Sequence, residues 1–141
     1  MGLPLAIALA KHYPVVGFDK SVKRITELRN GKDTNGEIDR KDFKGKRILF
    51  SSSEKFLGES EIYIITVPTP VNKKKKPDLF LLKHACKIVG KHITKNNIIV
   101  IESTVYPGVT EEICGSTLQK VSGLTCGKDF FLGYSPERIN P

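Results

Sequence analysis

The sequence is poor in the residues that build disulfide frameworks and metal sites. Its cysteines are odd in number, widely spaced and without a Cys-x-x-Cys pair: Cys86, Cys114 and Cys126. This usage argues against a disulfide framework and against a zinc site, and it fits a reducing compartment, the cytoplasm. The histidines also lack the spacing of metal ligands: His12, His84 and His92. We expect no metal and predict that the histidines are structural or exposed.

Long hydrophobic runs are also lacking. No stretch approaches the eighteen or so apolar residues that a membrane span needs. The apolar run near the start is only about eight residues long and has no basic segment before it, so a cleaved secretory signal is not expected. We therefore predict no membrane partner.

The bulk composition describes one globular domain of basic character. A chain of 141 residues has the length of a single domain, and 39% hydrophobic content is ordinary for a folded protein. The formal charge of +8 suggests an anionic partner, which a nucleic acid, a membrane surface or a phosphorylated small molecule would satisfy. Much of the excess lies in the run Lys73 to Lys76, which we interpret as a solvated loop tip.

Apolar periodicity and end signals predict helices that alternate with strands. Helices are expected over Leu3 to about Lys11, from the N-cap Ser21 to Asn30 with Gly31 as stop, in a short piece at 52–56, from the cap Asp78 to about Ile93, and over 109–122. Strands are expected at 13–19, 47–50, 61–67, 97–103 and 130–135, with loops at 32–46 and 68–77. The strand 61–67 is nearly continuous in apolar character, which indicates burial on both faces, and 97–103 is expected to be another buried strand.

No hairpin signal separates consecutive strands. Alternating strands and helices indicate βαβ units, so the predicted fold is α/β, a Rossmann-like doubly wound parallel sheet with helices on both faces. Ligands of such sheets bind beyond the carboxyl ends of the strands, and the residues that follow each strand are therefore the candidates for function.

Asp19 follows the first predicted strand. It lies 17 residues after Gly2, which precedes a helix, and this is close to the spacing at which an acidic side chain binds the adenosine ribose 2′-hydroxyl of a dinucleotide. A carboxylate at this place disfavours a 2′-phosphate. We therefore expect NAD rather than NADP, although Lys20 and Arg24 are near.

The next two strand ends offer hydroxyl groups. Thr66 and Thr69 lie in "TVPTP", where prolines restrict the chain and the hydroxyls suit a ribose or a pyrophosphate. Ser103 and Thr104 lie in "ESTVYPG". Two adjacent hydroxyls before a turn either bind a ligand or cap the following helix, and the spacing alone leaves both readings open.

The last strand runs into "GYSPERINP". This segment resembles a G-x-S-x-G nucleophile elbow, but Glu137 replaces the second glycine that the strained turn requires, so a serine hydrolase is not expected. The carboxylate of Glu137 and the guanidinium of Arg138 suit acid/base work and an anionic substrate.

Five segments together resemble a known family. In order and spacing, "GLPLA", "VVGFD", "TVPTP", "ESTVYPG" and "GYSPERINP" are similar to the N-terminal NAD-binding domain of the UDP-glucose/GDP-mannose dehydrogenase family. The nearest branch is the bacterial one that oxidises UDP-N-acetylhexosamines for surface polysaccharides. The resemblance covers essentially the whole chain, which we expect to form a single domain over residues 1–141.

The resemblance implies a four-electron oxidation. Enzymes of this family oxidise C6 of a nucleotide sugar with two NAD molecules, through an aldehyde and a cysteine thioester. It also implies a cofactor set and a substrate set in this chain. NAD would be bound by Gly2, Asp19, Arg24, Val67, Pro68, Thr69, Ser103 and Thr104. Thr104 and Glu137 would act in catalysis, and the UDP-sugar would be bound by Glu137, Arg138, Ile139 and Asn140.

The chain also departs from the family pattern. The family fingerprint reads G-x-G-x-x-G after a first strand, and only its third glycine, Gly2, has a counterpart here. The missing strand is expected to be central in the sheet, between 15–18 and 61–67. The nucleophilic cysteine of the family lies in a later region, so none of the three cysteines is assigned to catalysis.

Three functions remain open at this stage. The first is the cofactor domain of a UDP-sugar 6-dehydrogenase, inactive alone, that works in the cytoplasm as a homo-oligomer, a dimer, without nucleic acid or membrane. The second is a truncated, non-catalytic module for nucleotide binding or oligomerisation. The third is a relative of the β-hydroxyacid dehydrogenases, which share the fold but not "SPERINP".

Overall fold

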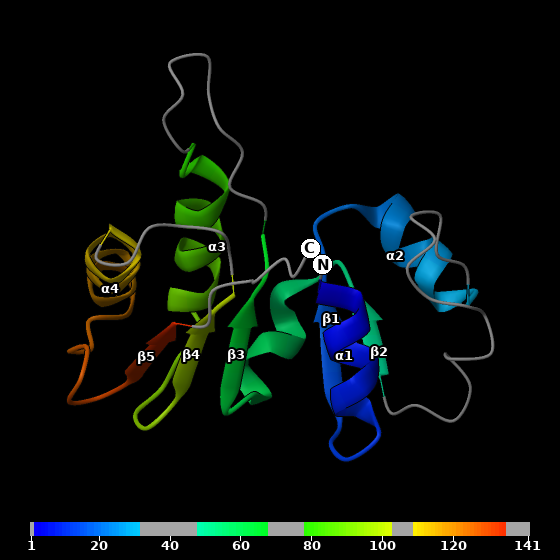
Figure 1. The fold of residues 1–141 in the computed structure, drawn as a ribbon, viewed down its shortest axis with the longest axis horizontal. Coiled ribbons are helices and arrows are strands. Elements are labelled where there is room, and N and C mark those ends of the chain that lie inside the picture. The colour runs from blue at the N-terminus through cyan, green and yellow to red at the C-terminus, as the bar shows by residue number, and fades with distance from the viewer. Residues whose placement is uncertain (1, 32–47, 68–77, 103–108, 135–141) are drawn as a thin grey trace, which may run out of the picture. The chain divides into compact units, whose positions relative to one another are not determined.

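The computed structural model of the chain describes residues 2–31, 48–67, 78–102 and 109–134. The chain divides into two compact units, Met1–Leu57 and Gly58–Pro141, and each contains its own sheet. Helices alternate with strands along both units (Figure 1). All strand pairs in the two sheets are parallel, which confirms the predicted α/β class.

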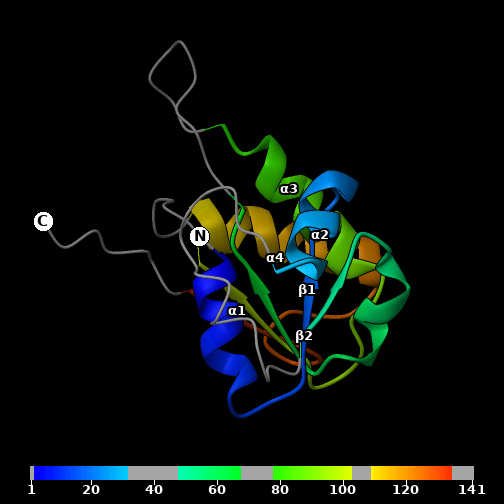
Figure 2. The same cartoon turned by 90° about the vertical axis from the view of Figure 1, so that its right-hand side faces the viewer.

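The first unit is built on a two-stranded sheet. Its elements are α1 (Gly2–Ala10), β1 (Val15–Phe18), α2 (Val22–Arg29) and β2 (Ile48–Ser51). Figure 2 shows β1 and β2 side by side, in a register that runs from Val15 opposite Ile48 to Phe18 opposite Ser51. The hydrophobic core of this unit consists of the buried residues Ile25, Leu28 and Phe50, and the partly buried Leu3 and Ile48 pack against them.

Local signals set the bounds of α2 as the sequence predicts. The Ser21 hydroxyl accepts a hydrogen bond from the Arg24 N–H at 3.2 Å, as an N-cap does. At the other end Gly31 has a φ of 73°, the left-handed conformation that glycine adopts most easily, and its N–H donates to the Leu28 carbonyl at 3.0 Å. Both the start and the stop of this helix are therefore encoded within a few residues.

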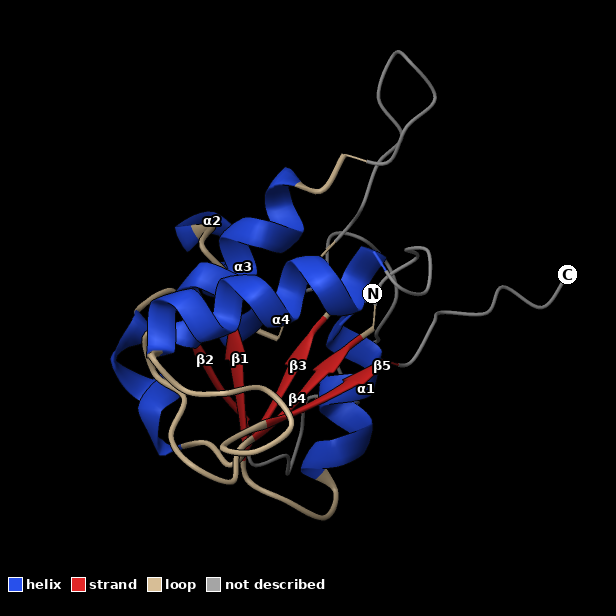
Figure 3. Ribbon diagram, turned by 90° about the vertical axis from the view of Figure 1, so that its left-hand side faces the viewer, coloured by secondary structure: helices blue, strands red, loops and turns tan. Residues whose placement is uncertain are grey.

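The second unit is built on a three-stranded sheet in the order β3, β4, β5. The strands span Ile62–Ile65, Ile98–Ile101 and Phe131–Tyr134, and the helices α3 (Phe80–Gly90) and α4 (Val109–Ser122) connect them. The 3-10 helix η2 (Glu54–Glu59) precedes β3. Figure 3 shows α3 and α4 along the same side of this sheet. Parallel strands require such crossovers, because a short turn cannot join them.

The two faces of this sheet differ in burial. On β4, Ile99 and Ile101 are fully buried, whereas Ile98 between β3 and β5 is 41% exposed. The register places Ile98 in one row with Ile62 and Phe131, which are 57% and 45% exposed. The prediction that strand 61–67 is buried on both faces is therefore wrong, and the strand expected at 97–103 is also buried on one face only. An unbroken apolar run does not reveal which of its alternate side chains are covered.

The start of α3 shifts relative to its predicted cap. The helix begins at Phe80 and ends at Gly90 instead of reaching Ile93. Asp78 lies two residues ahead of it, and its carboxylate accepts a hydrogen bond from the Phe80 N–H at 3.0 Å. Asp78 thus satisfies a backbone donor that the first turn leaves unpaired, which is the function of a cap at a neighbouring position.

Close packing joins α3 to α4. A β-carbon added at Gly90 would lie 3.0 Å from the Val121 Cβ, so the two helices approach closely at this glycine. Cys86 lies one turn before Gly90 on α3, and Cys114 lies two turns before Val121 on α4. Both cysteines are fully buried, and their side chains are hydrogen-bonded to each other.

The turn before β4 depends on one buried amide. Asn97 is 6% exposed, and its side-chain oxygen accepts hydrogen bonds from the Thr94 N–H at 2.7 Å and the Thr94 hydroxyl at 3.3 Å. We expect Asn97→Ala to lower the free energy of unfolding by about 1 kcal/mol, because the turn loses the hydrogen bonds that the Asn97 side-chain oxygen accepts from Thr94. Urea titration measures this. The control is Asn96→Gly, which should not destabilise, since Asn96 has a φ of 73°. An unchanged midpoint for Asn97→Ala would contradict the prediction.

Candidate functional site

The carboxyl ends of β1 and β2 present an exposed carboxylate. Asp19 directly follows β1, and its N–H donates to the carbonyl of Ser51, the last residue of β2, at 3.2 Å. This bond continues the parallel ladder by one residue and fixes the Asp19 backbone to the sheet. The side chain itself is exposed. A fixed backbone with an accessible carboxylate is suited to binding a ligand outside the strand ends.

A hydrogen-bonded turn holds the Asp19 carboxylate. One carboxylate oxygen, Oδ1, accepts a hydrogen bond from the Ser21 N–H at 2.9 Å. Ser21 is also the N-cap of α2, so the same residue links the carboxylate to the first turn that contains Arg24. In the sequence pattern Ser21 was predicted only as a helix cap. The signal that could have revealed its contact with Asp19 is the spacing Asp-x-Ser before a helix, which is typical of an Asx turn.

Positive charge surrounds this turn. The first turn of α2 contains no acidic residue. Lys20 and Lys23 are exposed and Arg24 is half-buried. At the far end of the helix the Arg29 side chain donates to the Phe50 carbonyl at 3.0 Å, which ties α2 to β2. The segment from Asp19 to Arg24 therefore combines one carboxylate with three cations. Its first residue is bonded to the end of β2, and the helix that follows it is bonded to β2 through Arg29.

The three strand ends of the second unit also lie at one edge of their sheet. β3 is followed by Thr66 and Val67, both half-buried. β4 is followed by Glu102, whose N–H donates to the Ile65 carbonyl at 2.9 Å. The register pairs Ile65 with Ile101 and Ile101 with Tyr134, the last residue of each strand. Whatever follows these strands therefore starts from a common edge.

The predicted site residues fall into three groups. Asp19 and Arg24 are brought together around Ser21 in the first unit, and Gly2 is the first residue of α1. Val67 lies at the strand edge of the second unit. The remaining predicted residues lie outside the described part of the chain: Pro68, Thr69, Ser103, Thr104, Glu137, Arg138, Ile139 and Asn140.

The shifted pKa values belong to the core of the second unit. Burial raises the pKa of the Tyr63 hydroxyl. The hydrogen bond between the two thiols, together with burial, raises the pKa of Cys86, and the same bond lowers the pKa of Cys114. Tyr63 is buried on β3, and Cys86 and Cys114 are buried on the two helices α3 and α4. Their shifts are consequences of packing and do not indicate a catalytic site.

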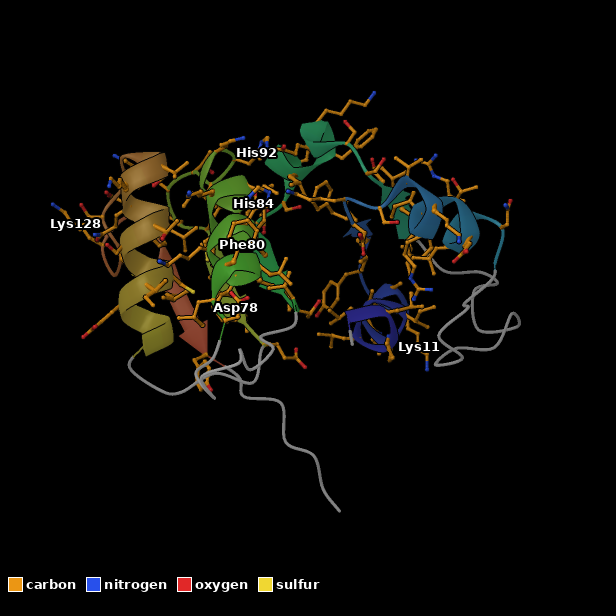
Figure 4. The ribbon with its side chains drawn as sticks, turned by 90° about the horizontal axis from the view of Figure 1, so that it is seen from above. Lys11, Asp78, Phe80, His84, His92 and Lys128 are labelled. Carbon is orange, nitrogen blue, oxygen red and sulfur yellow. The ribbon has the colours of Figure 1, made fainter. Side chains whose placement is uncertain are left out.

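The histidines serve no common site. His12 is exposed. His84 stacks on the ring of Phe80, one helical turn earlier on α3, with ring centroids 6.2 Å apart (Figure 4). The buried Nε2 of His84 has no hydrogen-bond partner among the residues that the structure describes. The prediction that His84 is structural is consistent with this stacked position.

Within residues 2–31, 48–67, 78–102 and 109–134, no helix is long and apolar enough to cross a membrane. The same residues contain no group of three or more histidine, cysteine, aspartate or glutamate side chains that could hold a metal ion.

The fold and the turn at Asp19 define a class of protein. Parallel strands with crossover helices, and an acidic side chain fixed at the end of β1 ahead of a helix, are the features with which α/β proteins bind the ribose of a nucleotide. The residues present fit the adenosine half of NAD, because the exposed carboxylate can accept hydrogen bonds from a ribose and would repel a 2′-phosphate.

Comparison with known proteins identifies the family. The model of the NAD binding domain of the UDP-glucose/GDP-mannose dehydrogenase family matches residues 1–141. The chain therefore belongs to this family, as its NAD-binding domain, which confirms the resemblance seen in the motifs.

Individual relatives agree with the family. The chain is 50% identical to a UDP-N-acetyl-D-glucosamine 6-dehydrogenase of Salmonella typhi and to Protein CapL of Staphylococcus aureus, each match covering the whole chain and 33% of the relative. A solved structure of a UDP-D-ManNAc dehydrogenase from Pyrococcus horikoshii superposes with a TM-score of 0.89 at 33% identity, over 99% of this chain and 34% of that one. The chain thus spans about a third of the length of these relatives.

Proposed function

We propose that the chain is the cofactor-binding part of a UDP-sugar 6-dehydrogenase, which oxidises the C6 alcohol of a UDP-N-acetylhexosamine or UDP-glucose to the uronic acid for surface polysaccharides. The observation that supports this most is the family match over residues 1–141, together with Asp19 fixed at the end of β1. The 50% identity to a UDP-N-acetyl-D-glucosamine 6-dehydrogenase favours an N-acetylated sugar.

The cofactor side of the proposal rests on residues at the strand ends. Asp19 accepts hydrogen bonds from the hydroxyl groups of the adenosine ribose, and Arg24 lies beside this ribose. Gly2 has no side chain and therefore lets the start of α1 approach the pyrophosphate. The backbone N–H groups at the amino end of a helix favour the negative charge of that group. The loops after β3 and β4 complete the NAD site with Val67, Pro68, Thr69, Ser103 and Thr104. When bound, NAD supplies a hydride acceptor for the oxidation of C6.

The substrate side of the proposal rests on the last segment. Glu137 acts as a base or orients water, Thr104 positions water or substrate, and Arg138, Ile139 and Asn140 line the UDP-sugar. Oxidation of a primary alcohol to a carboxylic acid removes four electrons as two hydrides and takes up one water, so two NAD molecules are consumed per sugar. We further propose that the enzyme is cytoplasmic and a homo-oligomer and needs neither nucleic acid nor a membrane.

A chimeric enzyme tests the proposal. The chain replaces the matching third of the Salmonella UDP-N-acetyl-D-glucosamine 6-dehydrogenase, to which it aligns over its whole length. We expect the chimera to form two NADH per UDP-N-acetylglucosamine, measured as absorbance at 340 nm. A chimera that binds NAD by calorimetry but oxidises no UDP-sugar would favour the non-catalytic nucleotide-binding module. Oxidation of a β-hydroxyacid in its place would favour that group of dehydrogenases.

A titration tests whether residues ahead of Gly2 contribute to NAD binding. NAD is titrated into the chain alone and into the chain preceded by a strand and the first two glycines of the fingerprint G-x-G-x-x-G. We expect at least about tenfold tighter binding to the extended chain, because the added backbone N–H groups approach the pyrophosphate. Equal and tight binding by both would mean that backbone N–H groups ahead of Gly2 contribute little.

A further inference from the structure

The turn at the end of β1 contains a residue that the family motifs do not assign. Ser21 makes two contacts that point in opposite directions along the chain. Its N–H donates to the Asp19 carboxylate at 2.9 Å, and its hydroxyl accepts from the Arg24 N–H at 3.2 Å. Its carbonyl also accepts from the Ile25 N–H at 3.1 Å, within the first turn of α2. Ser21 is therefore connected to both residues that are proposed to bind the adenosine ribose.

The contacts restrict Asp19 more than its exposure suggests. An exposed aspartate normally samples several rotamers, and ordering it on binding costs free energy. Here the Asp19 N–H is fixed to Ser51 and one carboxylate oxygen is fixed to the Ser21 N–H. These two bonds therefore favour one orientation of the Asp19 carboxylate before any ligand arrives.

We propose that Ser21 is a positioning residue for the dinucleotide, whose N–H orients the Asp19 carboxylate toward the ribose 2′-hydroxyl. This inference rests on the proposed NAD site. The two functions of Ser21 are separable, because the N–H belongs to the backbone and the hydroxyl to the side chain. The N–H serves Asp19, whereas the hydroxyl serves the start of α2.

Two substitutions separate these functions. Ser21→Ala removes the hydroxyl and keeps the N–H, whereas Ser21→Pro removes both. Ser21 has a φ of −73°, which proline adopts without strain. The two variants therefore lack the same cap and differ in the N–H that reaches Asp19. Thermal unfolding of both should report the same loss of the cap.

The readout is a ratio of affinities that a structural role would not change. NAD and its 2′-deoxyadenosine analogue are titrated into the chimera described above. We expect wild type to prefer NAD by about tenfold, the effect of one hydrogen bond to a charged group. Ser21→Ala should keep this ratio, and Ser21→Pro should lower it toward one. Ser21→Thr, which keeps both groups, should match wild type in ratio and stability.

A second variant covers the case in which the proline ring disturbs the fold. Lactic acid at position 21 has the side chain of alanine but joins the chain through an ester in place of the amide. Compared with Ser21→Ala, this variant therefore lacks the N–H that reaches Asp19. It should show the same lowered ratio as Ser21→Pro when compared with Ser21→Ala.

The outcomes distinguish this inference from the proposed function. A full preference for NAD in the ester variant would overturn the positioning role, as would a lost preference in Ser21→Ala. A wild-type ratio of one with normal NADH formation would overturn it too, while leaving the dehydrogenase function intact. Failure of the chimera to bind NAD at all would overturn both.

Discussion

Asp19→Asn is expected to weaken NAD binding by about 10- to 100-fold, the effect of changing a charged hydrogen-bond acceptor for the ribose into a neutral one. The reason lies in the carboxylate after β1, whose second oxygen is not needed for the bond with Ser21. Asparagine keeps an oxygen that can accept the Ser21 N–H, so α2 should start as before. Calorimetric titration with NAD measures the loss, and thermal unfolding serves as the control for folding.

The same variant should change the choice of cofactor. In the proposed site the Asp19 carboxylate repels a 2′-phosphate, although Lys20, Lys23 and Arg24 lie close in sequence. Without the negative charge these cations favour the phosphate, and the preference for NAD over NADP should fall by at least about tenfold. Binding of NAD by Asp19→Asn with wild-type affinity would show that the adenosine ribose lies elsewhere.

Ile99→Ala is expected to lower the free energy of unfolding by about 3 kcal/mol, because it opens a cavity between the sheet and its helices. Ile99 is fully buried on β4, the central strand of its sheet. Its neighbour Ile98 provides a matched control, since it has the same side chain on the same strand but is 41% exposed on the other face. Ile98→Ala should cost less than about 1 kcal/mol.

Guanidinium titration of both variants measures the difference. The slope of the unfolding free energy against denaturant should stay constant, so that the midpoints report stability alone. Equal losses for the two variants would contradict the prediction and would mean that the row of Ile62, Ile98 and Phe131 is covered in solution.

The elements of the fold were predictable because their signals are local. Ser21 and Gly31 mark the ends of α2 by backbone chemistry that involves residues three or four positions away, and the structure places both ends as expected. The parallel arrangement also followed from the order of elements alone. The exposure of Ile62 and Ile98 did not follow from the order of elements, because it depends on which face of the sheet the helices cover.

The candidate site was predictable to the extent that it follows strand ends. Asp19 was identified from its spacing to Gly2, and the structure adds the bonds that hold it. The contact between Cys86 and Cys114 had no sequence signal, since the two residues meet only after α3 and α4 pack against each other at Gly90. Contacts between helices that are distant in sequence require the tertiary structure.

The parallel ladder of the second unit also has a kinetic consequence. Ile62 pairs with Ile98, and Ile98 with Phe131, so every partner lies a whole helix and its loops farther along the chain. No strand pair of this sheet can therefore form as a local hairpin. Each pairing closes a long loop, and the loss of chain entropy on closure opposes it. Folding of this unit should begin in α3 and α4, because the turns of a helix form from contacts close in sequence. The sheet should form late, so its apolar strands should stay exposed to water longer than the helices.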